Sequence, residues 1–105
     1  MLRSLREAME TLRRHVRVLE VVVEHQPIGI GRIADVTGME WHKVRYSLRV
    51  LEEEGIIRPS KRGAVLTEDA PARISEISRR LSELNREFED ISKRYQSLAR
   101  KLEEG

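Results

Sequence analysis

Residues 74 to 102 place an apolar side chain at alternating intervals of three and four residues, for about four heptads. The apolar positions are Ile74, Ile77, Leu81, Leu84, Phe88, Ile91, Tyr95, Leu98 and Leu102. No glycine or proline lies between Pro71 and Gly105, and Pro71 suits the first turn of a helix that Asp69 caps. A helix with one narrow apolar seam cannot bury that seam on itself. The pattern therefore predicts a coiled-coil helix over residues 70–105, with these nine residues forming a dimer interface.

The charges beside this seam bear on the direction of pairing. One flank carries Arg73, Arg80, Glu87, Arg94 and Lys101, and the other carries the uncharged Ser78, Asn85, Ser92 and Ala99. A parallel pair brings unlike flanks together and gains no ion pairs, whereas an antiparallel pair can place Glu87 near Arg94 of the second chain. The same register sets Arg80 near Lys101, and exposed pairs contribute only ~0–1 kcal/mol each. The charges favour the antiparallel direction and leave the parallel one open.

A second amphipathic helix is predicted over residues 2–25. Its apolar positions are Leu2, Leu5, Met9, Leu12, Val16, Leu19 and Val23, again three and four residues apart. Val21 and Val22 widen the apolar face near the end, where we expect the globular core to begin, and Pro27 ends the pattern. We expect this stripe to dock on the uncharged flank of the long helix within a homodimer.

Residues 26–67 have shorter apolar spacings that turns interrupt. A short helix is predicted to end at Gly38 and a longer one at Gly55, because glycine is favoured just beyond a helix end. The extended runs IIRPS and AVLT flank the sequence KRG and predict a β-hairpin. Two helices joined by a tight turn and followed by a hairpin make a winged helix-turn-helix. The predicted fold is therefore mainly α, with this domain in residues 1–69.

The longer of these two helices has a predicted inward and a predicted outward face. Val44, Leu48 and Leu51 lie on one side and are expected in the core. Glu40 is expected to cap the helix.

The segment GIGRIA at residues 29–34 also fits G-x-G-x-x-A, the outline of a dinucleotide-binding turn. A chain of 105 residues has no room for the repeated βαβ units of that fold. The preceding VVVE belongs to a helical pattern, so no strand leads into the turn. We interpret the match as coincidental: Gly29 begins a helix, and Ala34 is small where the next helix crosses it. No cofactor is predicted.

Composition narrows the class of protein further. There is no cysteine, and the histidines at positions 15, 25 and 42 do not cluster, so neither a disulfide nor a metal site is predicted. No apolar run approaches the ~20 residues that span a bilayer, and Arg3 and Arg6 interrupt any signal peptide. We expect a soluble, cytoplasmic protein without a membrane partner. Many charges with one Asn and two Gln resemble the composition of thermophile proteins.

The stretch IGRIADVTGMEWHKVRYSLRVLEEEGIIRPSKRGAVLTE resembles the DNA-binding region of winged-helix transcriptional regulators of the MarR and ArsR type. The most specific part is VRYSLRVLEEEGII, which is similar to the recognition helix and the entry into the wing. The long C-terminal helix is similar in arrangement to small archaeal winged-helix proteins that dimerise through a coiled coil. The resemblance implies double-stranded DNA as partner. Metal or effector sensing is not implied, because the chain lacks cysteines and a long wing; any small-molecule effector is unknown.

The predicted DNA-binding residues combine positive charge with hydrogen-bonding capacity. They are Arg32, Trp41, His42, Lys43, Arg45, Tyr46, Arg49, Lys61 and Arg62. Arginine can read guanine or hold a phosphate, and tyrosine and histidine can bond to phosphates or base edges. Each residue also has a plain structural alternative: Trp41 and Tyr46 can cover the core edge, and Arg49 can pair with a glutamate on its own helix.

Two functions are compatible with these patterns. The favoured one is a homodimeric DNA-binding protein, either a transcriptional regulator or an architectural relative. The alternative is an assembly module that works through its coiled coil. From residue 26 to residue 67 there are seven basic and five acidic residues, and three of the acids lie together at a helix end, which favours DNA. No nucleophile–base spacing indicates an enzyme.

Overall fold

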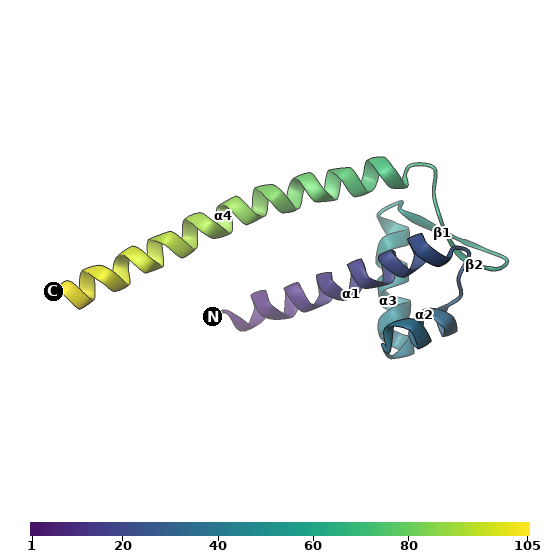
Figure 1. Ribbon diagram of the computed structural model, residues 1–105, viewed down its shortest axis with the longest axis horizontal. Helices are drawn as coiled ribbons and strands as arrows, with labels where there is room; N and C mark the ends of the chain where they lie inside the picture. The colour runs from purple at the N-terminus through teal and green to yellow at the C-terminus, as the bar shows by residue number, and fades with distance from the viewer. The chain divides into compact units, whose positions relative to one another are not determined.

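The computed structural model describes all 105 residues as four helices and one hairpin (Figure 1). The elements are α1 (Arg3–His25), α2 (Ile30–Thr37), α3 (Trp41–Glu53), β1 (Ile57–Ser60), β2 (Gly63–Leu66) and α4 (Ala70–Glu104). This confirms the predicted fold class, a mainly α protein with a small β-hairpin and a long C-terminal helix. The chain divides into two compact units, Met1–Arg73 and Ile74–Gly105.

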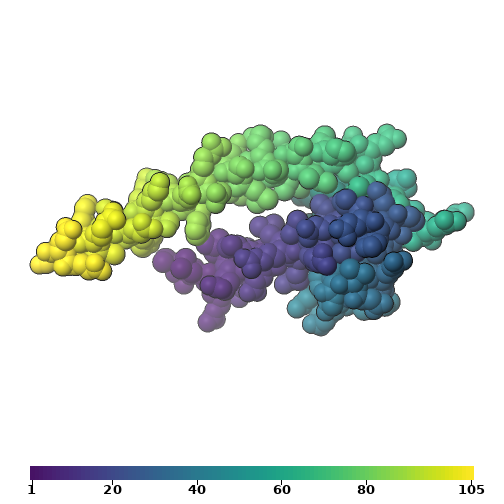
Figure 2. Space-filling view, in the orientation of Figure 1, coloured from purple at the N-terminus to yellow at the C-terminus, as the bar shows by residue number.

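The core of the N-terminal unit lies where the end of α1 packs against α2, α3 and the hairpin. Its buried apolar residues are Val18, Val21, Val22, Ile28, Ile33, Ala34, Val44, Leu51, Ile56, Ile57, Ala64 and Ala70. The atoms of this unit gather into a compact body around the later part of α1, and the beginning of α1 extends beyond it (Figure 2). The first three turns of α1 therefore contribute little to the core of their own unit.

The apolar surface of α1 differs from the sequence prediction, because it consists of two separate faces. Val18, Val21 and Val22 are buried, and none of them belongs to the predicted stripe. At 3.6 residues per turn, Leu12 and Val16 lie roughly 120–160° around the helix from Val18. A single widened face was therefore the wrong interpretation: the valines face the core, and the stripe faces away from it.

The inward face of α3 also differs from the prediction at one position. Val44 and Leu51 are buried as expected, whereas Leu48 is only half-buried at the edge of the core. The third fully buried residue of this helix is Ser47. Positions 44, 47 and 51 form the central row of this helix face, since their spacing of three and four residues matches the helical repeat, and Leu48 flanks that row.

The hairpin is anchored to the segment that follows α1. Its two strands pair in antiparallel register from Ile57 opposite Leu66 to Ser60 opposite Gly63. Ile28 forms an isolated antiparallel bridge to β2: its N–H donates to the carbonyl of Ala64, and its carbonyl accepts from the N–H of Ala64. Gly63 is required beside this bridge. Its φ is 126°, and a Cβ there would lie 2.3 Å from the carbonyl carbon of Ile28.

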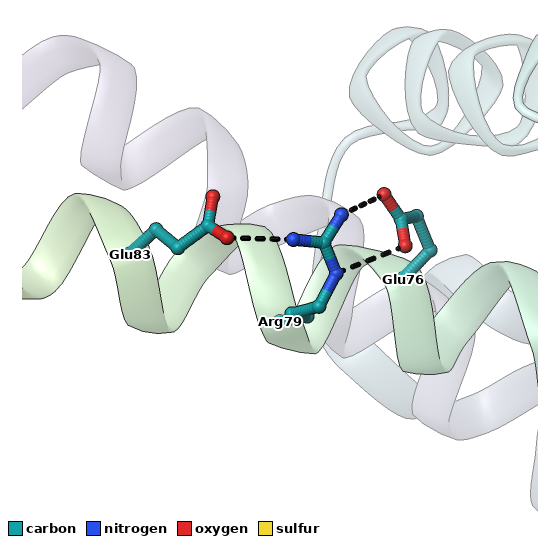
Figure 3. A network of polar contacts seen from close by, with 3 residues as sticks. All are labelled: Glu76, Arg79 and Glu83. Atoms are coloured by element: carbon teal, nitrogen blue, oxygen red, sulfur yellow. Dashed lines mark hydrogen bonds and ion pairs between the residues drawn. The ribbon is translucent and has the colours of Figure 1, made fainter.

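On α4, an ion-pair cluster stiffens the first part of the helix away from the apolar seam. Arg79 donates to Glu76 one turn before it and to Glu83 one turn after it, with a distance of 2.6 Å to Glu83 Oε1 (Figure 3). The hydrogen bond from Arg79 lowers the pKa of Glu76. All three side chains are exposed, so the cluster supports the helix by local pairing and contributes no burial.

Two glycines with positive φ are predicted to differ sharply in their tolerance of a side chain. Gly38→Ala places a methyl group in open space, so only the left-handed backbone is strained, at a cost of about 1–2 kcal/mol. Gly63→Ala forces a φ of 126°, which lies beyond the left-handed helical region, and a clash with the backbone at Ile28, so we expect a larger loss of at least ~3 kcal/mol. Urea unfolding of the two variants measures the difference, and equal losses would contradict the close approach at Gly63.

Candidate nucleic-acid interface

The outward face of α3 carries most of the predicted DNA-binding residues. His42, Arg45 and Arg49 are exposed and lie on the side opposite to Val44 and Leu51, as their spacing requires. Tyr46 is 48% exposed at the border of this face, and Lys43 is half-buried on its other side. The fold therefore presents Arg45 and Arg49, one turn apart, on the side of α3 that is not packed against the core.

The arginines of this region have no acidic partner in the structure. Arg45 and Arg49 form no ion pair, and neither does Arg32, which is exposed on α2. The alternative pairing of Arg49 with Glu52 or Glu53 is absent. An exposed cation without a carboxylate partner is free to bind an anion, since no existing interaction has to be broken.

Glu40 plays a different role from the one predicted for it. It occupies the N-cap position of α3 with extended backbone angles, but its side chain makes no capping hydrogen bond. Instead the carboxylate lies 3.5 Å from Nδ1 of His42 and 3.7 Å from Nζ of Lys43. The side chain reaches sideways over the first turn, where the ammonium group of Lys43 attracts it. It therefore offsets part of the positive charge at the beginning of α3.

Trp41 combines packing with exposure. Its ring lies against Gly31 of α2, where an added Cβ would be 3.2 Å from the ring edge. The side chain is nevertheless 55% exposed. The second glycine of the GIGRIA segment thus makes room for the tryptophan, which is a packing role. The outer part of the ring remains available to a partner.

The hairpin turn holds a second group of cations. Lys61 and Arg62 form the two-residue loop between β1 and β2, and both are exposed. Ser60 braces the loop: its hydroxyl donates to the carbonyl of Gly63 at 2.6 Å and accepts from the N–H of Arg62 at 3.3 Å. Arg58 is exposed on β1 and also has no ion pair. Sequence reasoning missed Arg58, although an arginine beside a buried isoleucine in a strand marks the exposed side of that strand.

A buried polar contact joins α1 to α3 directly behind this face. Nδ1 of His15 and Oγ of Ser47 share a hydrogen bond of 2.7 Å. Ser47 has no exposed surface, so its hydroxyl depends on His15 and is closed to any substrate. The ring of His15 also lies 5.5 Å from the ring of Tyr46. The sequence missed this contact because 32 residues separate the two partners; the only local signal was a serine in the apolar row of α3.

The environment of His15 disfavours its charged form. Burial lowers the pKa of His15, and the positive charge of Arg14 lowers it further. The folded protein therefore holds a neutral imidazole against Ser47 under conditions in which an unfolded chain begins to bind a proton.

Comparison with known proteins found no matching family model and no matching curated protein. None of the four helices combines the length and the apolar character needed to span a membrane.

The lowered pKa of His15 predicts a specific pH dependence of stability. As the pH falls below about 6.5, His15 binds a proton in the unfolded state before it does so in the folded state. The contribution of His15 to the free energy of unfolding is therefore fully present above that pH and declines below it. His15→Ala should remove this component and should also lower stability at pH 8 by about 1–3 kcal/mol, because Ser47 loses its partner. Urea unfolding between pH 5 and 8 measures both effects. The exposed His42, replaced by alanine, is the matched control and should keep the slope; an unchanged slope in His15→Ala would contradict the assignment.

Proposed function

We propose that this chain is a homodimeric protein that binds double-stranded DNA, with α2 and α3 as a helix-turn-helix and the β1–β2 hairpin as its wing. The observation that carries the proposal is the outward face of α3, where Arg45 and Arg49 stand exposed and without acidic partners. A recognition helix needs such a face, because guanidinium groups bond to guanine edges and to phosphates.

The other cations support a footprint wider than one helix. Arg32 on α2 suits a flanking phosphate, and Lys61 and Arg62 suit the backbone or minor groove beside the site. The cluster Glu52 to Glu54 lies at the C-terminal end of α3. A helix whose N-terminal turns enter the groove keeps these acids away from phosphate. The role is that of a transcriptional regulator or an architectural DNA protein.

Dimerisation completes the proposal, since two copies of the domain read two half-sites. Seven residues of the predicted α4 seam, from Leu81 to Leu102, are between 46% and 82% exposed. These seven residues are Leu81, Leu84, Phe88, Ile91, Tyr95, Leu98 and Leu102. Ile74 and Ile77 are half-buried. An uninterrupted apolar row of this length on an isolated helix favours a coiled coil with a second copy.

Binding of mixed-sequence DNA at several salt concentrations tests the function directly. A DNA-binding protein with several phosphate contacts loses affinity steeply as salt rises. An assembly module would show no such salt-dependent binding. Selection from random DNA then separates the two DNA-binding roles, since an enriched palindrome marks a sequence-specific regulator and no enrichment marks an architectural protein.

Arg45→Ala and Arg49→Ala should each weaken DNA binding while leaving the fold intact, because both residues are exposed. A base-reading arginine contributes about 1–3 kcal/mol, roughly a 5- to 150-fold change in Kd, and its loss relaxes preference at one base position. Fluorescence anisotropy with a labelled duplex measures the change.

Two variants control this experiment. Arg86→Ala removes the same charge from the outer side of α4 and should leave affinity nearly unchanged. Glu40→Gln removes the carboxylate that lies beside His42 and Lys43, and should strengthen binding. If Arg45→Ala and Arg49→Ala bind like Arg86→Ala, the outward face of α3 is not the DNA-binding surface.

Leu84→Asp should convert the dimer into monomers in sedimentation experiments. The substitution places a carboxylate in the middle of the α4 seam, where pairing would bury it without a partner. Helix content should remain, since residue 84 is 58% exposed in the single chain. Glu83→Asp, beside it but outside the seam, is the matched control. A dimer that survives Leu84→Asp with unchanged affinity would show that self-association does not depend on the α4 seam.

A further inference from the structure

The apolar stripe on α1 remains exposed after the N-terminal unit has folded. Its six exposed members are between 41% and 66% accessible. They are Leu2, Leu5, Met9, Leu12, Val16 and Val23. The core valines of α1 lie on the other side of the helix, so no movement within this core could bury the stripe. The stripe is a continuous row over about 30 Å of helix, which is typical of a helix-pairing surface.

The two flanks of this stripe differ in accessibility. One flank contains His15 and Val22, which are half-buried and buried in the core of the same unit. The opposite flank is open; Glu20 lies on it with 58% of its side chain exposed, 3.9 Å from the guanidinium of Arg17 on the same helix. A helix that pairs with the stripe must therefore meet the open flank, and the charges there decide which helix fits.

The charges of the open flank are complementary to the same flank in reverse order. From the N-terminal end this flank carries Arg6, Arg13 and Glu20, each directly after a residue of the stripe. An antiparallel copy of the helix forms one kind of opposite-charge pair beside the stripe, Arg6 with Glu20, twice by symmetry. Only Arg13 meets its own copy, at the two-fold axis. In this register the apolar layers are Leu5 with Val23, Met9 with Leu19, and Leu12 with Val16.

The uncharged flank of α4, which the sequence suggested as a docking face, fits less well. Ser78, Asn85 and Ser92 offer no opposite charge to the arginines and glutamates of α1. A parallel copy of α1 also gains nothing, because it would bring the open flank against the flank that contains Val22.

We infer that the exposed stripe of α1 binds the same stripe of a second copy of this chain in antiparallel orientation. The contact is isologous, with its two-fold axis near Arg13, and it is additional to the α4 coiled coil. It does not depend on DNA binding. If it closes within the α4-linked dimer, it fixes the distance between the two copies of α3; if it joins different dimers, it links them into larger assemblies.

Cross-linking in the full chain tests this inference, because the protein has no cysteine of its own and each introduced thiol reports one position. Three single variants are made: Arg6→Cys, Arg13→Cys and Glu20→Cys. All three sites are exposed on the open flank, and a short bifunctional maleimide is the probe. We expect Arg13→Cys to link to itself, and a mixture of Arg6→Cys with Glu20→Cys to link at least ~5-fold better than either variant alone.

Two results would overturn the inference. Efficient self-links at both position 6 and position 20 would show a parallel contact. No α1 link, under conditions in which a cysteine in the α4 seam links efficiently, would show that something other than a second α1 covers the stripe.

Charge reversal supplies an independent measurement. Arg6→Glu and Glu20→Arg should each weaken self-association by ~3- to 10-fold at low salt, and the double variant should recover it, since both pairs are re-formed with reversed sign. Failure of the double variant to recover would contradict the antiparallel register.

Discussion

Burial of three valines near the end of α1 is the contact on which the N-terminal unit depends. Val18, Val21 and Val22 have almost no exposed surface and pack where α2 and α3 meet. They fix the rotation of α1, and Val44 and Leu51 fix the rotation of α3 against them. Burying one face of a helix turns its opposite face to solvent, so this packing leaves the stripe of α1 and the cationic face of α3 exposed.

The same packing buries Ser47, the one fully buried polar residue of the core. Ser47 faces inward because its neighbours at positions 44 and 51 do, and its hydroxyl then needs a partner. His15 supplies it from α1, next to the ring of Tyr46 at the border of the proposed DNA-binding face. The packing of α1 on α3 thus gives Ser47 its hydrogen-bond partner and, by burying His15, lowers the pKa of that histidine.

How far the sequence predicts this fold depends on the range of the interaction. Gly38, Gly55 and the KRG turn mark ends of elements through local backbone preferences, so the order and bounds of the helices and strands were predictable. The roles of Leu48 and Glu40 were predicted wrongly. Leu48 lies at the edge of its apolar row, and the Glu40 carboxylate lies beside Lys43 and His42 and makes no capping hydrogen bond. Neither outcome follows from helical spacing alone.

The sequence by itself determined which segments are helical, where they stop, and which residues carry charge, because these follow from local spacing and backbone chemistry. Only the tertiary structure decided which of two apolar faces α1 buries, that Gly31 makes room for Trp41, and that Gly63 must lack a side chain beside Ile28. It also decided that His15 is held neutral against Ser47. These features join residues far apart in the chain, and their energies depend on packing distances that no periodic pattern encodes.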